Sequence, residues 1–244
     1  YQNVKKRMLT KWPDAYTIAY FQAGTNTYKP ISELKALYDE ALAADDKIIG
    51  LNIGTRWDAL DEEKYELLAS YNNKTDLTVE LGLQSIHEKT ASFINRQHSL
   101  ECFENAVREL RKRNIEVVVH IINGFHIESK DDMLATIHYL NKLDIQGIKI
   151  HLLHIMKKTM LGYLYESNQF PILSLEEYVD IVCDQLEILR DDIIVHRVTG
   201  DAPKDLLIAP KWSLKKFVVM NEIDKEMRRR NTYQGSKYQK NSQM

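Results

Sequence analysis

The chain has 244 residues, of which 44% are hydrophobic and 28% are charged, and its formal net charge is -2 at pH 7. Such a composition is typical of an ordinary globular protein. The near-zero net charge gives no overall electrostatic signature of a nucleic-acid-binding or membrane-binding protein. The length suits one large domain or two small ones, and single-domain α/β barrels commonly reach this size.

No apolar run reaches the roughly 20 residues that a membrane-spanning helix needs, and no signal peptide is visible. Cys102 and Cys183 lie in helical patterns, and we expect both to be small buried side chains in a reducing, cytoplasmic compartment. Residues 1–8 lack an initiator Met and have an amphipathic helical pattern. We interpret this as a chain whose N-terminal segment has been trimmed.

Short β-rich apolar runs alternate along the chain with longer segments of helical periodicity. The predicted strands are residues 17–23, 48–54, 76–84, 116–124, 147–155 and 193–200. The predicted helices are residues 32–43, 61–71, 100–113, 130–143 and 175–189. Repeated β-α units predict a parallel sheet covered by helices, as a barrel, a partial barrel or an open doubly wound sheet.

Four serines mark expected helix starts. Ser32, Ser99 and Ser129 precede acidic residues, and Ser174 opens a capping-box pattern that ends at Glu177. A serine cap and nearby acidic side chains both stabilise the positive end of a helix. We therefore expect each serine to cap a helix.

Polar side chains follow almost every predicted strand. They are Gln22 to Tyr28, Arg56 with Asp58, Gln84 with Ser85, Asn123 to Ser129, His151 with His154, and Arg197 to Asp201. Ligands bind at the carboxyl ends of parallel strands in both barrels and open sheets. We therefore predict one shared ligand pocket built from these strand ends.

Individual residues leave alternatives open. Arg56 either pairs with Asp58 in a loop or recognises a carboxylate through its fork-shaped guanidinium. Glu80 lies inside a strand, where a carboxylate needs a partner, and either a structural ion pair or a role in the pocket is consistent with that. Gln84 has a donor and an acceptor, which suit a ribose diol, or it stabilises its own loop.

The histidines do not complete a metal site. His151 and His154 are three residues apart on a predicted strand, and no third ligand follows at a convincing spacing. The sequence also lacks a Gly-x-Ser-x-Gly elbow, a Walker loop and a Gly-x-Gly-x-x-Gly motif. Hydrolase, phosphotransferase and dinucleotide-binding functions are therefore poorly supported.

Six segments together resemble one protein family. They are YFQAGTNTY (20–28), IGTRWD (53–58), VELGLQSIH (79–87), IKIHLLH (148–154), HRVTGD (196–201) and LLIAPKWSLKK (206–216). The combination resembles the radical S-adenosylmethionine (SAM) superfamily, in the branch of YhcC and YtqA. It is more distantly similar to the SAM domain of the elongator catalytic subunit, which modifies the wobble uridine of tRNA.

The resemblance implies an α/β fold: a partial (β/α)6 TIM-like barrel of radical SAM type that lacks its first strand in this chain. It implies a truncated barrel core over residues 1–155. A C-terminal extension over residues 156–226, with an extra strand, is expected to pack on the barrel. Residues 227–244 are then expected to be a basic, flexible tail.

The resemblance also implies two cofactors, SAM and a [4Fe-4S] cluster. In this superfamily a Cys-x3-Cys-x2-Cys motif holds the cluster, and SAM occupies the fourth iron. An electron from the cluster, supplied by a donor such as flavodoxin or ferredoxin, cleaves SAM to methionine and a 5′-deoxyadenosyl radical that abstracts hydrogen from the substrate. Neither Cys102 nor Cys183 has that spacing, so the cluster ligands are expected outside this chain, which alone would be inactive.

The resemblance assigns cofactor-binding roles by position and assigns no catalytic residue. The residues are Gln22, Asn26, Arg56, Glu80, Gln84, Ser85, Arg96, Gly124, His151 and His154. Gln84 and Ser85 lie where the family contacts the SAM ribose. Arg96, just after a short helical turn, lies where it contacts the methionine carboxylate. Residues 151–154 lie by the adenine, largely through backbone groups, residues 22–26 lie near the methionyl amine, and Gly124 opens the adenine-side turn.

The preferred substrate is a tRNA nucleoside. The distant elongator similarity implies it, and basic and aromatic residues in the segment 228–238 are consistent with RNA binding. A disordered, solvated terminus explains the same residues at least as well. Two other functions stay open: a cluster-free barrel enzyme with acid–base chemistry, and a non-catalytic SAM- or ligand-binding module.

Overall fold

The computed structural model describes residues 5, 8, 10–168 and 170–239. The amphipathic helix predicted over residues 1–8 lies largely outside these described residues. The chain divides into two compact units. Unit 1 comprises Tyr1–Leu81 and Arg108–Val117, and unit 2 comprises Gly82–Val107 and Val118–Met244.

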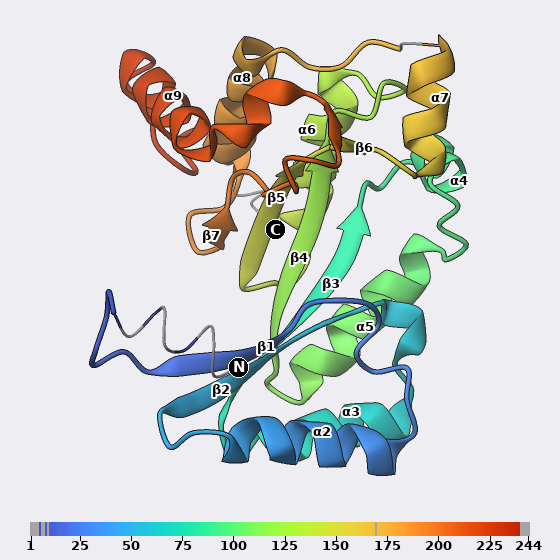
Figure 1. Ribbon diagram of the computed structural model, residues 1–244, viewed down its shortest axis with the longest axis vertical. Helices are drawn as coiled ribbons and strands as arrows, with labels where there is room; N and C mark the ends of the chain where they lie inside the picture. Colours follow the sequence, from blue (N-terminus) through green and yellow to red (C-terminus); the bar gives the residue numbers. More distant parts are fainter. Residues whose placement is uncertain (1–4, 6–7, 9, 169, 240–244) are drawn as a thin grey trace. The chain divides into compact units, whose positions relative to one another are not determined.

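Six parallel strands follow the order β1-β2-β3-β4-β5-β7 (Figure 1). They are β1 (Thr17–Phe21), β2 (Ile48–Thr55), β3 (Asp76–Gln84), β4 (Glu116–Asn123), β5 (Gly147–Leu152) and β7 (Ile194–Arg197). Two short strands, β6 (Ile155–Met156) and β8 (Leu207–Ala209), form a separate antiparallel pair. The predicted α/β fold, a partial barrel of parallel strands, is confirmed.

Helices alternate with these strands. They are α2 (Ile31–Ala43), α3 (Glu62–Asn72), α4 (Glu88–Phe93), α5 (Leu100–Lys112), α6 (Lys130–Leu140), α7 (Met160–Asn168), α8 (Leu175–Ile188) and α9 (Lys216–Arg229). In unit 2, α9 packs against α8 (Figure 1). Helices α4, α7 and α9 have no counterpart among the predicted ranges. No helix in the described part of the chain combines the length and the apolar character needed to cross a membrane.

Three predicted serine caps are confirmed. Ser129 and Ser174 each form a complete capping box, with Asp132 and Glu177 as the partner residues. Ser99 Oγ accepts a hydrogen bond from a backbone N–H in the first turn of α5 (3.3 Å). These helix starts depend on side chains three residues apart, which is why the sequence alone predicts them.

Two local predictions are wrong. Ser32 does not cap α2, because the helix begins at Ile31, after Pro30, and its N-cap makes no side-chain hydrogen bond. The fixed backbone angle of Pro30, φ -57°, allows the helix to start before the serine. Cys102 is exposed rather than buried, whereas Cys183 is buried, and burial raises the pKa of its thiol to about 11.

Aromatic side chains hold the helices of unit 1 on its strands. Phe21 of β1, Tyr38 of α2 and Tyr71 of α3 meet edge to face, with ring centroids 5.3 Å and 5.5 Å apart. The Tyr38 hydroxyl donates to Asn26 O (2.7 Å). The loop after β1 is thereby attached to α2, which fixes the position of Asn26.

A buried pair of amides joins β4 to α8 in unit 2. Asn123 Nδ2 donates to Gln185 Oε1 (2.7 Å), and Gln185 Nε2 donates to Asn123 Oδ1 (2.9 Å). Both side chains are almost fully buried. Buried amides are costly unless they are paired, so the reciprocal bonds fix the carboxyl end of β4 against the helix.

Residues 230–238 pack along α8, and we call them the C-terminal strap. The backbone N–H groups of Gly235 and Lys237 donate to carbonyls in the last turn of α8, at 3.0 Å and 2.7 Å. Gln234 Nε2 donates to two carbonyls in the segment between α8 and β7, both at 2.7 Å. The segment expected to be a flexible tail from residue 227 is therefore held by specific contacts over its described part.

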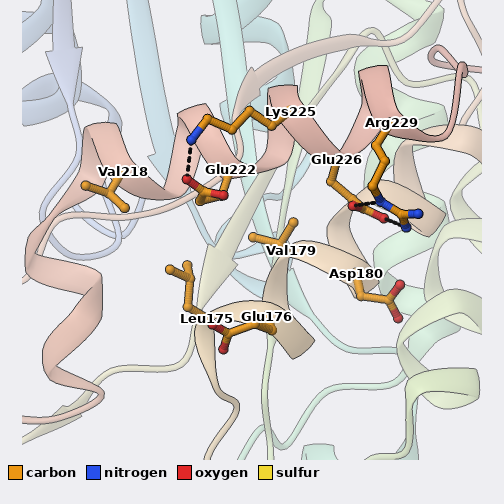
Figure 2. Close-up of a pocket in the computed structure, with 9 residues that line it drawn as sticks. All are labelled: Leu175, Glu176, Val179, Asp180, Val218, Glu222, Lys225, Glu226 and Arg229. Carbon is orange, nitrogen blue, oxygen red and sulfur yellow. Dashed lines mark hydrogen bonds and ion pairs between the residues drawn. The ribbon is translucent and has the colours of Figure 1, made fainter.

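The basic side chains of this region pair with acidic side chains of α8 and α9. The pairs are Arg228–Asp224 (2.8 Å), Arg229–Glu226 (2.6 Å), Arg230–Asp184 (2.5 Å), Arg230–Glu226 (2.8 Å), Arg230–Asp180 and Lys237–Glu187, each between a side-chain nitrogen and a carboxylate oxygen. Figure 2 shows the Arg229–Glu226 pair beside a pocket between α8 and α9. The cations that suggested RNA binding are thus engaged with acidic groups of the chain itself.

Candidate functional site

The turn at the end of β3, in unit 2, brings three of the predicted residues together. Gln84 adopts a positive φ of 64°, which is uncommon for a residue other than glycine. Arg96 follows α4 and donates from Nη1 to Leu83 O (2.9 Å) and to Ser85 O (2.5 Å). The guanidinium therefore ties the loop after α4 to the turn that carries Gln84 and Ser85.

The side chain of Gln84 lies over Gly82. A Cβ built on Gly82 would lie 2.5 Å from Gln84 Nε2. The absence of a side chain at Gly82 therefore forms a cradle that holds the amide in its present position. An amide offers both a donor and an acceptor to a ligand.

The Ser85 hydroxyl is committed to the turn itself. Ser85 Oγ and Thr90 Oγ1 both donate to Glu128 Oε1, and the backbone N–H of His87 donates to Ser85 Oγ (3.1 Å). Ser85 is 1% exposed. Its side chain thus fixes the shape of the turn in this structure, and Glu128 is the residue that anchors it.

A polar pocket of about 440 Å³ includes Arg96 among its lining residues. The pocket is lined by Glu88, Ser92, Asn95, Arg96, Gln97, His98 and Ser99, from α4 and the segment before α5. Burial lowers the pKa of Arg96 from its ordinary value. The guanidinium nevertheless stays protonated at physiological pH. A fixed cation in a polar pocket suits an anionic group such as a carboxylate.

His151 and His154 lie at the carboxyl end of β5. A Cβ built on Gly200, in the turn after β7, would lie 3.2 Å from His151 Nδ1 and 3.6 Å from His154 Cε1, so this turn packs against both rings. His120 of β4 stacks on His151, with ring centroids 5.1 Å apart. Burial is the main cause that lowers the pKa of His151 to about 3, and burial also lowers the pKa of His154. The imidazole of His151 is therefore neutral at pH 7.

Gly124 begins the turn after β4 in a conformation that requires glycine. Its φ of 99° is strained for any residue with a Cβ, and an added Cβ would lie 3.2 Å from Leu173 Cδ1. Two residues later, His126 stacks on Phe170, with ring centroids 4.0 Å apart. Gly124 therefore offers a ligand only its backbone, on a turn supported by aromatic packing.

Unit 1 contains the other predicted residues, and three of them, Asn26, Arg56 and Glu80, make structural contacts. Asn26 Nδ2 donates to Phe21 O (2.9 Å) and Gly54 O (2.7 Å), so the amide joins the ends of β1 and β2. Arg56 and Asp58 form an exposed bidentate ion pair, at 2.9 Å and 2.7 Å. For Arg56 the structure shows the loop ion pair, which was one of its two open interpretations.

Glu80 is the buried acid of unit 1, at 2% exposed. Its carboxylate accepts from the Tyr20 hydroxyl of β1 (2.6 Å) and from Asn52 Nδ2 of β2 (3.4 Å). The carboxylate thus belongs to a polar network across β1, β2 and β3. Gln22, by contrast, is exposed to solvent.

Three polar residues of unit 2 bear on the site and were not among the predicted site residues: Glu128, Gln185 and Thr199. Glu128 and Thr199 lie in strand-end segments that the sequence does single out. Gln185 is a polar residue among apolar positions of α8, and that interruption is the sequence signal for a buried partner.

Potential metal ligands are scattered among the described residues. The described residues contain no group of three or more His, Cys, Asp or Glu side chains placed to hold a metal ion. The sequence has two cysteines, Cys102 and Cys183. A cluster held by three thiolates therefore cannot take all its ligands from this chain.

Comparison with known proteins identifies the protein family to which this fold and these strand-end residues belong. The model of the radical SAM superfamily matches residues 4–140, and the model of the Radical_SAM C-terminal domain matches residues 145–229. The chain belongs to the radical SAM superfamily.

Its similar relatives include two bacterial proteins. It is 46% identical over 240 residues to YtqA of Bacillus subtilis. This match covers 98% of this chain and 74% of the relative. It is 31% identical over 209 residues to protein YhcC of Escherichia coli K12, covering 85% of this chain and 67% of the relative. The predicted YhcC/YtqA-like branch of the superfamily is confirmed.

A solved structure shares the fold. The archaeal Methanocaldococcus infernus Elp3, with its N-terminal residues 1–46 deleted, superposes with a TM-score of 0.82 at 18% identity. The match covers 95% of this chain, which spans 58% of the length of that structure. At this identity the match establishes the shared partial-barrel architecture.

Proposed function

We propose that this chain is part of a radical SAM enzyme that cleaves SAM reductively and abstracts a hydrogen atom from its substrate. Membership of the superfamily supports SAM and a [4Fe-4S] cluster as the cofactors. When bound, the cluster supplies the electron that generates a 5′-deoxyadenosyl radical, while the protein binds, orients and shields the cofactor. The cluster ligands come from outside this chain, which alone is inactive.

The observation that carries the proposal is the turn at the end of β3. Gln84 is held at positive φ over Gly82, and Arg96 braces the same turn through two carbonyls. We propose that the Gln84 amide and the backbone of Ser85 hold the ribose of SAM. The Arg96 guanidinium, in its polar pocket, orients the methionine carboxylate.

Residues 151–154 and the turn at Gly124 lie by the adenine through backbone groups. Gln22, Asn26, Arg56 and Glu80 remain proposed cofactor contacts of unit 1.

The proposed substrate is a nucleoside of tRNA, as in the wobble-uridine modification that the distant elongator resemblance implies. An electron donor such as flavodoxin or ferredoxin is the proposed redox partner. The proposed location is the reducing cytoplasm, which is consistent with two cysteines that form no disulfide with each other.

SAM cleavage by the full reading frame tests the proposal. The protein is reconstituted anaerobically with iron and sulfide, reduced, and assayed for 5′-deoxyadenosine. We expect product from the wild type and about tenfold less from Gln84→Ala, the loss that one hydrogen bond explains. Gln146→Ala is the matched control, since that amide donates to Asp144 in a loop (2.8 Å) and should leave turnover unchanged. A reconstituted cluster without SAM cleavage would refute the proposal.

Gly82→Ala tests the cradle directly. The added Cβ meets the far end of a flexible side chain, so Gln84 moves and the backbone does not. We expect a shift in melting temperature of about 2 °C or less and a roughly tenfold loss of SAM affinity by equilibrium dialysis. Gly50→Ala is the contrast, because its Cβ would lie 2.7 Å from the backbone O of Asp76, and there the melting temperature should fall. Unchanged SAM affinity in Gly82→Ala would show that the position of Gln84 is irrelevant to binding.

A further inference from the structure

Unit 2 carries a group of exposed lysines that pair with no carboxylate among the described residues. Lysines elsewhere in the described chain often pair with an acid, as in Lys29–Glu33 (2.8 Å) and Lys225–Glu222 (2.8 Å). Such pairs leave little charge for a partner. The lysines of the group are Lys157, Lys158, Lys204, Lys211 and Lys215. We call them the β6–β8 lysine patch.

The antiparallel pairing of β6 and β8 brings these lysines together. Lys157 and Lys158 directly follow β6, and Lys204 lies in the turn before β8. The Lys157 backbone N–H donates to Leu206 O (2.8 Å), which sets the two segments side by side. The remaining two lysines follow β8, at the start and just after the end of the short helix η2 (Lys211–Leu214). One surface therefore collects lysines that are more than 40 positions apart in sequence.

The patch keeps its positive charge. Lys157 Nζ donates to Asp205 O (3.0 Å), and Lys211 Nζ donates to Leu207 O. Backbone carbonyls fix these ammonium groups in place without neutralising them. Residues 157–158 and 204–215 together contain five lysines and one acid, Asp205. Like charges held close together repel one another, so the patch favours a partner that is negatively charged at several points.

Helix α7 adds an exposed aromatic side chain beside the patch. Strand β6 leads into α7 (Figure 1). Gly162 of α7 packs on the strand pair, since a Cβ built on it would lie 3.3 Å from Ile208 Cδ1 of β8. The next residue, Tyr163, is 59% exposed. Exposed aromatic rings next to basic residues are typical of surfaces that bind single-stranded nucleic acid, because unpaired bases stack on them.

The patch also lies at the end of unit 2 where a substrate would be needed. Strand β6 begins at Ile155, three residues after β5 ends at Leu152. The carboxyl ends of parallel strands are where ligands bind in such folds. A polyanion on the patch would therefore pass close to residues 151–154, which are among the proposed cofactor contacts.

We propose that the β6–β8 lysine patch binds the phosphate backbone of an RNA and that Tyr163 stacks on one of its unpaired bases. The inference rests on the proposed function, which supplies an RNA as the substrate. Lysine ammonium groups bind phosphates as point charges. The basic residues of the C-terminal strap are engaged with acidic groups of α8 and α9, whereas those of the patch are not.

A lipid surface is the other polyanion that basic residues attract. Stable binding to it needs an apolar face that enters the bilayer. Ile155 of β6 and Leu207 of β8 are fully buried, so the strand pair presents lysines rather than such a face. RNA is therefore the favoured partner, and lipid vesicles enter the test as a competing outcome.

The test is fluorescence anisotropy of this chain with a labelled RNA hairpin over a series of salt concentrations. Each lysine–phosphate contact contributes about 0.7–0.9 to the slope of log affinity against log salt concentration. The triple variant Lys158→Gln, Lys204→Gln, Lys215→Gln should lower this slope by about two and weaken binding at least about tenfold. Each single substitution should lower the slope by about 0.7–0.9, which provides the same test without the combined change.

A matched triple variant controls for the loss of charge. Lys29→Gln, Lys35→Gln, Lys225→Gln removes the same charge from exposed lysines that pair with acids, and RNA affinity should change less than about twofold. Tyr163→Ala should weaken binding about tenfold and leave the salt slope unchanged, because stacking releases no counterions.

Three results would overturn the inference: no RNA binding by the wild type, equal losses in the two triple variants, or binding to anionic phospholipid vesicles in place of RNA. The proposed function is tested separately by SAM cleavage in the full protein. Cleavage without RNA binding would refute the patch alone. RNA binding that depends on the patch, without cleavage, would refute the proposed function alone.

Discussion

Replacing Arg230 by Met is expected to lower the free energy of unfolding by about 3 kcal/mol, a large effect for a residue near the end of the chain. Its side chain is 15% exposed and lies among Asp180, Asp184, Glu187 and Glu226, of which Glu187 is 2% exposed. Removing the cation leaves four carboxylates, one of them buried, with one partner fewer. Removing one member of a buried ion pair is strongly destabilising because the remaining charge is left uncompensated. Urea denaturation followed by circular dichroism measures the change.

The neighbouring Arg228 provides a matched control. Its side chain is 78% exposed and pairs with one exposed acid, Asp224. Exposed ion pairs contribute little, so Arg228→Met should change the free energy of unfolding by about 0.5 kcal/mol or less. Equal effects of the two substitutions would mean that the C-terminal strap does not stabilise the folded chain.

The pH dependence of the Arg230→Met effect gives a second check. Burial alone would raise the pKa of Asp184, but hydrogen bonds from Lys130 and Arg230 outweigh it and hold the pKa below its ordinary value. A lowered folded-state pKa stabilises the protein above the unfolded-state pKa, about 3.9, and this stability is lost as the pH falls through the folded-state value. The stability difference between wild type and Arg230→Met should therefore shrink as the pH falls below about 4.

Arg96→Ala is expected to reduce SAM affinity more than any other single change at the β3 turn. The guanidinium braces the turn through Leu83 O and Ser85 O, and it is also the proposed partner of the methionine carboxylate. Charge-assisted hydrogen bonds contribute about 1.5–3 kcal/mol each, so we expect affinity to fall by roughly 100-fold. Equilibrium dialysis with SAM measures this, and near-ultraviolet circular dichroism reports whether the fold persists.

Arg96→Lys separates the two roles of this residue. A lysine keeps the charge but lacks the planar fork, so it should recover part of the affinity without bracing both carbonyls. The exposed Arg228→Ala serves as the control for loss of a positive charge. SAM affinity that is unchanged in Arg96→Ala would remove Arg96 from the binding site and leave it a structural brace.

Local signals account for the parts of the fold that the sequence predicts well. Strand β3 has its predicted bounds, because apolar residues recur at every second position up to the turn that follows it. The capping boxes at Ser129 and Ser174 depend on residues three positions apart. The strap is different, since Lys237 contacts Glu187, 50 residues earlier. No local pattern reveals such a partner, and a basic terminal segment read alone resembles a solvated tail.

The candidate site shows the same difference between residues that are close in sequence and contacts that only the fold creates. Gln84, Ser85 and Arg96 lie within 13 positions of one another, and the structure brings them together. Asn26 is different, because its amide donates to backbone carbonyls at the ends of β1 and β2. The sequence does not reveal this structural role. Thr199 was not among the predicted site residues, because a threonine in a turn is common in any sequence. Only the fold shows that it is buried.

The contrast between the two cysteines determines how this chain behaves toward thiol reagents. Cys102 is open to solvent, whereas Cys183 is enclosed and its pKa of about 11 keeps it in the unreactive thiol form. A maleimide at neutral pH will therefore modify one position, on α5. That position is a natural single attachment point for a fluorophore.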